Sequence, residues 1–120
     1  MMDKATVTEI ENDLQQFTGT EQYHKHWLGQ VYTDGVQYMA ARCGAFWLLD
    51  VVFSYHRKEP FQVWELKITE NGNGRQGVVT MVEDKNCPVL VRQEIPFTDF
   101  PLPSMKMWLI DGVLILPSEY

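Results

Sequence analysis

The chain has 120 residues, of which 45% are hydrophobic and 22% are charged, and its formal net charge at pH 7 is −6. This length and composition are typical of one globular domain over residues 1–120, and they exclude a repeat protein or a low-complexity chain. Acids and bases are spread along the whole sequence without a basic stripe that could neutralise phosphates. We therefore expect no direct nucleic-acid binding, and the acidity suits either solubility or a basic partner.

The N-terminus and the apolar segments exclude two further classes of protein. No cationic segment followed by an apolar one opens the chain, which argues against a secretory signal. The longest apolar runs, at residues 46–53 and 113–116, are much shorter than the roughly 20 residues that cross a bilayer. We expect a cytoplasmic protein with no membrane partner and no cofactor. Cys43 and Cys87 stand in no metal-binding or redox motif, so both are predicted to be reduced thiols with a packing role.

The N-terminal half is expected to be helical. A first helix begins with the capping-box pattern of Thr6 and Glu9, carries an apolar stripe from Val7 to Phe17, and ends at Thr18-Gly19. Residues 20–32 leave two alternatives open, an extended segment or a short helix.

Two more helices are expected after this segment. Thr33 or Asp34 caps a second helix, which ends at Gly44 and buries Val36, Met39, Ala40 and Cys43. A third helix covers residues 45–55, and spacing assigns its buried face to Trp47, Leu48, Val51, Val52 and Tyr55.

From Phe61 the apolar period changes to two, which predicts strands. The expected strands cover residues 61–68, 77–83, 89–95, 105–110 and 113–116, with turns at residues 71–74, 83–86 and 111–112. Helices followed by strands predict an α+β fold, in which the N-terminal helices pack on one face of an antiparallel meander of about five strands.

His24 and His26 form the best candidate for a metal site. On a strand they would share a face and could reach one ion, with Asp34, Asp50 or Glu21 as a third ligand. No diagnostic spacing supports this set, and two exposed histidines are the ordinary explanation.

The remaining candidates are polar residues of the third helix and of three short phrases, which cover residues 33–35, 98–101 and 116–120. They could form a binding site, and we name Thr33, Asp34, Asp50, Thr98, Asp99, Glu119 and Tyr120. If the carboxylates met in one cleft, mutual repulsion would favour acid–base chemistry. The alternative is structural. Asp34 and Asp99 would make local bonds at a cap and a turn, and Asp50 would pair with Arg57 or a tyrosine hydroxyl.

These phrases, together with two further segments at residues 17–21 and 46–50, resemble those of a bacterial family of small single-domain proteins of unknown function. The resemblance runs from about Leu14 to Tyr120 and rests on residues 17–21, 32–36, 46–50, 98–101 and 116–120. It implies a small accessory protein, of the kind found on bacterial genomes and mobile elements, and it implies no activity, cofactor or catalytic residue.

Without a catalytic signature, the sequence favours a non-enzymatic binding or regulatory domain. Four Trp, five Tyr and six Phe exceed what a core of this size needs, and exposed ones such as Tyr23, Trp27 or Trp108 would mark a protein-binding surface. One version is a mobile-element inhibitor that occupies a nucleic-acid groove, which requires acids clustered on one face. The alternative is a metal-dependent or acid–base enzyme that uses His24, His26 and nearby carboxylates. A homo-oligomer that pairs through the last hairpin is a third hypothesis.

Overall fold

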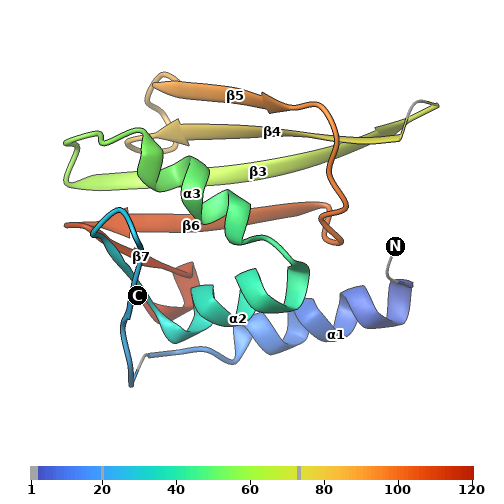
Figure 1. Cartoon of the computed structure of the whole chain (residues 1–120), viewed down its shortest axis with the longest axis horizontal. Coiled ribbons are helices and arrows are strands. Elements are labelled where there is room, and N and C mark those ends of the chain that lie inside the picture. Colours follow the sequence, from blue (N-terminus) through green and yellow to red (C-terminus); the bar gives the residue numbers. More distant parts are fainter. Residues whose placement is uncertain (1–2, 20, 73) are drawn as a thin grey trace.

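The computed structural model describes residues 3–19, 21–72 and 74–120. The helices are α1 (Lys4–Gln15), α2 (Asp34–Cys43), α3 (Phe46–Ser54) and the 3₁₀ helix η1 (Pro117–Glu119). The strands are β1 (His24–Lys25), β2 (Val31–Tyr32), β3 (Phe61–Asn71), β4 (Gly74–Val82), β5 (Val91–Ile95), β6 (Ser104–Ile110) and β7 (Val113–Ile115). Figure 1 shows their arrangement. Two residues of the predicted motifs, Thr20 and Asn73, lie outside the described residues.

The α+β class is confirmed, but the sheet is larger and mixed. It has seven strands in the order β1-β2-β7-β6-β3-β4-β5. All neighbours are antiparallel except β2 and β7, which are parallel. Strands β3, β4 and β5 form the expected meander, whereas β6 pairs with the other side of β3. Strands β1 and β2 belong to the segment that the sequence left open, and two residues each are too few for a period to show.

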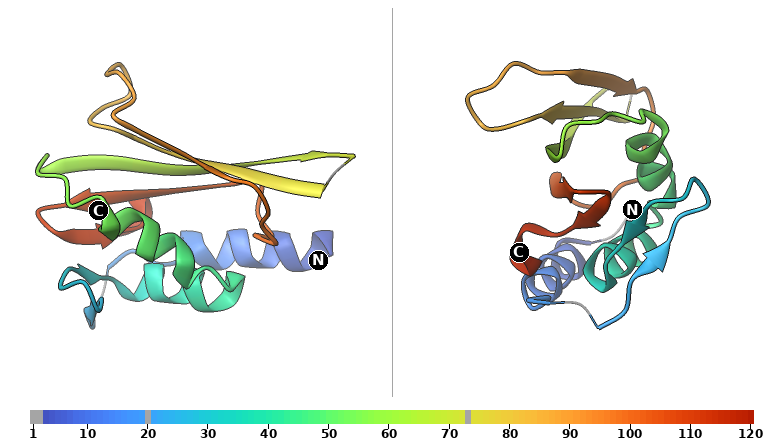
Figure 2. Two further views of the ribbon diagram at one scale, coloured as in Figure 1. Left: turned by 45° about the horizontal axis from the view of Figure 1, so that its top comes forward. Right: turned by 90° about the vertical axis from the view of Figure 1, so that its left-hand side faces the viewer.

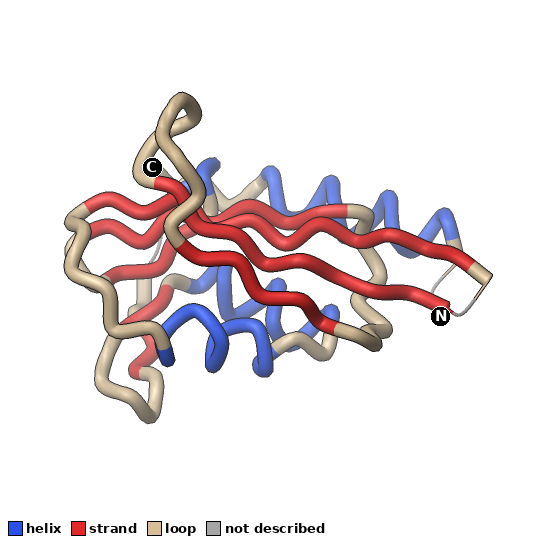
Figure 3. Tube along the Cα trace, turned by 90° about the horizontal axis from the view of Figure 1, so that it is seen from above, coloured by secondary structure: helices blue, strands red, loops and turns tan. Residues whose placement is uncertain are grey.

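One face of the sheet carries the core. Alternate strand residues such as Trp64, Leu66, Val79 and Met107 are buried together with apolar residues of all three helices. The opposite face carries half-buried and exposed side chains. In the right-hand view of Figure 2, α3 lies on one side of the sheet and the loop between β4 and β5 projects to the other side. Figure 3 shows the same strands from above.

Capping side chains set the helix boundaries. The capping box at Thr6 is wrong: α1 begins earlier, because the Asp3 carboxylate accepts the Thr6 N–H at 2.8 Å. It also ends at Gln15, before Thr18-Gly19. For α2 the prediction is confirmed, since Thr33 is the N-cap and Gly44 ends the helix in the left-handed conformation with φ 62°.

Helix α3 is rotated relative to the prediction. Its buried residues are Leu48, Leu49, Val52 and Phe53. Trp47, Val51 and Tyr55, which the spacing placed inside, are partly exposed on the flank of the helix. Both rows are apolar, so spacing alone could not select the inward one.

The last hairpin also differs from the prediction in one respect. Its turn is as expected, because Asp111 and Gly112 both have positive φ, 49° and 84°. It is not an exposed edge, because β6 pairs with β3 and β7 pairs with β2. The edges of the sheet are β1 and β5. In the part of the chain that the structure describes, no helix has the length and apolarity needed to span a bilayer.

Candidate functional site

The first and last candidate phrases meet at the N-terminus of α2. The Glu119 carboxylate accepts the Thr33 hydroxyl at 2.6 Å, the Leu116 N–H at 2.9 Å and the Gly35 N–H at 3.2 Å. A carboxylate is favoured there because the first N–H groups of a helix have no partner within the helix. Glu119 therefore fastens the C-terminus to α2. Tyr120 points elsewhere and packs edge-on against Trp108, with ring centroids 5.3 Å apart.

Gly35 permits this close approach. A Cβ atom at this position would lie 2.7 Å from Glu119 Oε1 and 2.7 Å from a methyl carbon of Leu116. Gly35 is a buried residue of α2, so glycine is needed here for the close contact with Glu119 and not to form a turn. This joint is structural, and it leaves little room for a ligand.

Asp34 connects a different segment to the same helix end. Its carboxylate accepts the N–H groups of Glu21 and Gln22 at 3.1 and 3.2 Å, and it lies 2.9 Å from His24 Nε2. These partners are 10–13 residues away in sequence, so Asp34 binds a distant segment of the chain from the first residue of α2. The His24 ring also stacks on Tyr32, which holds β1 against β2.

His26 pairs with a second carboxylate, on α3. Its Nε2 lies 2.7 Å from Asp50 Oδ1, and its Nδ1 accepts the Leu28 N–H at 3.0 Å. Because Nδ1 must offer a lone pair to Leu28, Nε2 carries the proton and donates it to Asp50. Asp50 also accepts the Trp27 indole N–H at 3.0 Å. The predicted partner, Arg57, instead pairs with Glu59.

The two histidines therefore do not form one site. Each contacts its own carboxylate, and both ring nitrogens of His26 already have partners. Among the residues that the structure describes, no group of three or more His, Cys, Asp or Glu side chains could hold a metal ion.

The phrase Thr98-Asp99-Phe100-Pro101 lies in another part of the fold. Thr98 Oγ1 accepts the Phe100 N–H at 3.1 Å, so Thr98 rather than Asp99 makes the local bond. Phe100 is fully buried, and its carbonyl accepts from Arg75 at 2.6 Å. Arg75 also pairs with Glu70. The loop is thus fixed at its base, while Asp99 is exposed at its tip.

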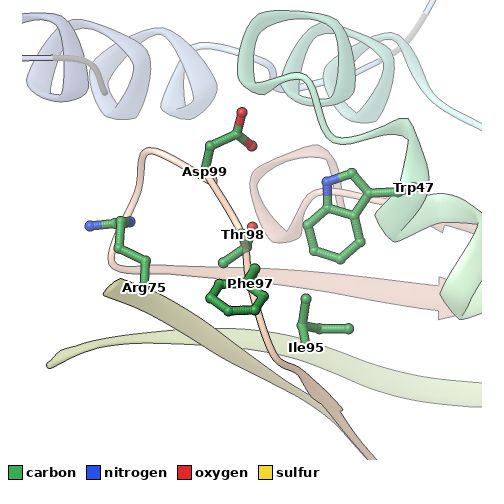
Figure 4. Close-up of a pocket in the computed structure, with 6 residues that line it drawn as sticks. All are labelled: Trp47, Arg75, Ile95, Phe97, Thr98 and Asp99. Atoms are coloured by element: carbon green, nitrogen blue, oxygen red, sulfur yellow. The ribbon is translucent and has the colours of Figure 1, made fainter. Parts of the chain in front are cut away.

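This loop and α3 border an open pocket of about 520 Å³, which is lined by Trp47, Arg75, Ile95, Phe97, Thr98 and Asp99. In Figure 4 the Trp47 and Phe97 rings border it, and the Arg75 guanidinium points away from Trp47. Phe97 is 77% exposed. Among the described residues, neither the Asp99 carboxylate nor the Trp47 indole N–H has a hydrogen-bond partner. The pocket thus combines aromatic faces with an unpaired anion.

The pocket is one flank of a larger surface, which we call the α3 surface. It consists of the exposed and half-exposed side chains of α3 and the exposed aromatics beside them: Trp27, Phe46, Trp47, Asp50, Val51, Tyr55 and Phe97. Trp27, which is 77% exposed, adjoins this surface because its indole N–H binds Asp50. Phe97 adjoins it because Phe97 and Trp47 line the same pocket. The sequence analysis named Trp27, Asp50 and Asp99 but missed Trp47, Arg75 and Phe97 as site residues. The signal was available, because residues 46–53 contain a single charge and are too apolar for a helix with one solvent face.

The other ionisable groups do not add a second site. Burial raises the pKa of the Cys43 thiol to about 11, so this cysteine is an inert part of the core, as predicted. Cys87 is exposed in the loop between β4 and β5, so the packing role expected for it is wrong. Acids occur on α1, α3, β3, β5 and several loops, and many have a partner of their own.

The architecture and this surface define an α+β domain with an apolar helix exposed at its surface. The model of a family of unknown function, DUF6876, matches residues 8–120, and the chain belongs to this family. No match was found among curated proteins or among solved structures.

Proposed function

We propose that this protein is a non-enzymatic binding domain that acts on another protein through the α3 surface. The observation that carries the proposal is the row of apolar side chains that α3 leaves exposed or half-exposed. A helix that is apolar on both halves normally lies inside a protein, and contiguous exposed apolar groups with a polar rim mark binding sites. Phe46 and Tyr55 are exposed on α3, whereas Trp47 and Val51 are partly exposed and also pack against the core. Trp and Tyr in such a position are the residues that most often dominate binding energy.

The charges suggest the chemistry of the partner. Asp99 lies unpaired beside two aromatic faces, and Arg75 is already engaged by Glu70 and the Phe100 carbonyl. An aromatic face attracts a cation, and an unpaired carboxylate reinforces this attraction. We infer a partner whose contact region is apolar and carries a basic side chain for this pocket. The net charge of −6 favours encounter with such a surface.

The more specific role of a mobile-element accessory protein agrees with this proposal if the partner is a protein of the host. The version that mimics nucleic acid receives no support, because the acids are distributed over the fold. The enzyme alternative has one favourable observation, the hydrogen-bond reach of His24 to Asp34 and of His26 to Asp50. An enzyme would require both histidines to act in one site, but His24 contacts Asp34 and His26 contacts Asp50.

Affinity capture with matched variants tests the proposal. The bait is the whole chain, incubated with a lysate of the native cell, and the captured proteins are quantified by mass spectrometry. We expect Phe46→Ser/Phe97→Ser to lose the partner that wild type retains. The control is Val89→Ser/Tyr120→Ser, which removes two hydrophobic side chains of similar exposure elsewhere and should retain it. Asp99→Asn should weaken capture and make it less sensitive to salt. Equal capture by both double variants would refute the α3 surface as the binding site.

A further inference from the structure

Strand β5 is an open edge of the sheet. It pairs with β4 on one side, and it ends the strand order. Figure 1 shows it at the rim of the sheet, and among the described residues no other strand pairs with it. Such a strand presents alternate backbone N–H and C=O groups that lack a strand partner, and these groups can bind a further strand.

The two faces of β5 differ in chemistry. Gln93 and Ile95 point toward the helices, since Gln93 accepts the Tyr55 hydroxyl at 2.6 Å and Ile95 lines the pocket with Trp47. Arg92 and Glu94 point to the opposite face, where their side chains are 58% and 72% exposed. They lie within 3.1 Å of each other along the strand.

These charges make β5 complementary to itself in one antiparallel register. When two copies of a strand pair about a two-fold axis, each residue faces one of equal parity, because the faces of the sheet are preserved. A two-fold axis that passes at residue 92 places Arg92 opposite Arg92 of the other copy, and an axis at residue 94 places Glu94 opposite Glu94. An axis at Gln93 pairs all five residues of β5 and places each Arg92 opposite a Glu94 of the other copy. Opposite charges that face each other across strands are stabilising, and like charges are destabilising.

We propose that β5 binds β5 of a second copy of this chain, antiparallel and centred on Gln93, so that one sheet continues through both copies. The inference does not rest on the proposed function, because the charges lie on the face of β5 away from the α3 surface. Pro88 and Pro96 flank the strand and limit pairing to a short segment, which favours the one register that uses every residue. The same symmetry brings Ile95 of both copies to one face of the continuous sheet.

Charge variants test the register directly by sedimentation equilibrium. Wild type should be a dimer at micromolar concentration. Arg92→Glu places like charges opposite each other in both cross-strand pairs, and so does Glu94→Arg, so each variant should weaken the dimer about tenfold or more. Both side chains are exposed, and circular dichroism should show that the variants fold as wild type does.

Two combinations give the decisive result. The double variant Arg92→Glu/Glu94→Arg restores opposite charges and should dimerise again. An equimolar mixture of the two single variants should form a heterodimer, because each supplies the charges that the other needs. A wild type that stays monomeric at several hundred micromolar, or single variants that dimerise as well as wild type, would overturn the proposal. Binding of an unrelated extended peptide by monomeric wild type would also overturn it, and would assign the edge to a different occupant.

Discussion

The substitution Gly35→Ala tests the joint between α2 and the C-terminus. In an ordinary helix interior this change is stabilising by about 1 kcal/mol, because glycine is a poor helix former. Here the added Cβ would lie 2.7 Å from Glu119 Oε1 and 2.8 Å from Glu119 Cδ, which is too close for any real contact. The Glu119 side chain would have to move away from the start of α2.

The cost follows from the bonds that this movement breaks. Glu119 accepts three hydrogen bonds, from the Thr33 hydroxyl and from the Leu116 and Gly35 N–H groups. A hydrogen bond to a charged group contributes about 1.5–3 kcal/mol, and partial exposure of Glu119 places these bonds at the lower end. Loss of two such bonds, offset by about 1 kcal/mol of helix propensity, predicts a net destabilisation of about 2 kcal/mol.

A double-mutant cycle in urea isolates the contact. The free energy of unfolding of wild type, Gly35→Ala, Glu119→Ala and the double variant can be followed by the fluorescence of the four tryptophans. We expect each single variant to be destabilised and the double variant to be destabilised by less than the sum of the two, because the contact with Glu119 is lost only once and the close approach to the Leu116 methyl group remains. If Gly35→Ala is as stable as wild type or more stable, the close contact with Glu119 does not exist and the reasoning fails.

Four further predictions concern titratable groups. At pH 8, iodoacetamide should modify Cys87 in the native protein and Cys43 only after unfolding; rapid labelling of both would contradict the burial of Cys43. Since the pKa of Cys43 is raised from 9.0 to about 11, its contribution to stability is complete below pH 9 and should be lost as pH rises toward 11, which unfolding curves of wild type and Cys43→Ala can compare. The bond from the Tyr38 hydroxyl to Asp13 raises the pKa of Tyr38, so Asp13→Asn should lower that pKa in an ultraviolet titration. Nitrogen-15 NMR should find neutral His26 protonated on Nε2, and a proton on Nδ1 would refute its bond from the Leu28 N–H.

Local patterns predicted the parts of the fold that depend on neighbouring residues. The period of two over β3, the Asp111-Gly112 turn and the Thr33 cap all follow from chemistry within a few positions, and the structure confirms them. Strands β1 and β2 could not be predicted, because two-residue strands are stabilised by partners far away in sequence. The rotation of α3 was missed for a related reason, since both of its halves are apolar and only packing selects one.

For the candidate site, too, the sequence identified residues but not their distant partners. The sequence identified Thr33, Asp34, Asp50 and Glu119 as unusual polar residues, but their partners are 10 to 86 residues away. No spacing rule connects Thr33 to Glu119 or His26 to Asp50. The phrases around Asp34 and Glu119 are joints of the fold, whereas those around Trp47 and Asp99 meet at a pocket with unpaired groups.

Site-specific photo-crosslinking in the native cell tests the α3 surface most directly. Replacement of Phe46 by benzoylphenylalanine places a crosslinker on this surface, and replacement of Tyr120, which is also exposed, provides a control elsewhere on the fold. We expect the chain with the crosslinker at position 46 to be joined to a defined partner protein, the control not to be, and Asp99→Asn to reduce the yield. A partner joined from position 120 and not from position 46 would show that the α3 surface is not the binding site.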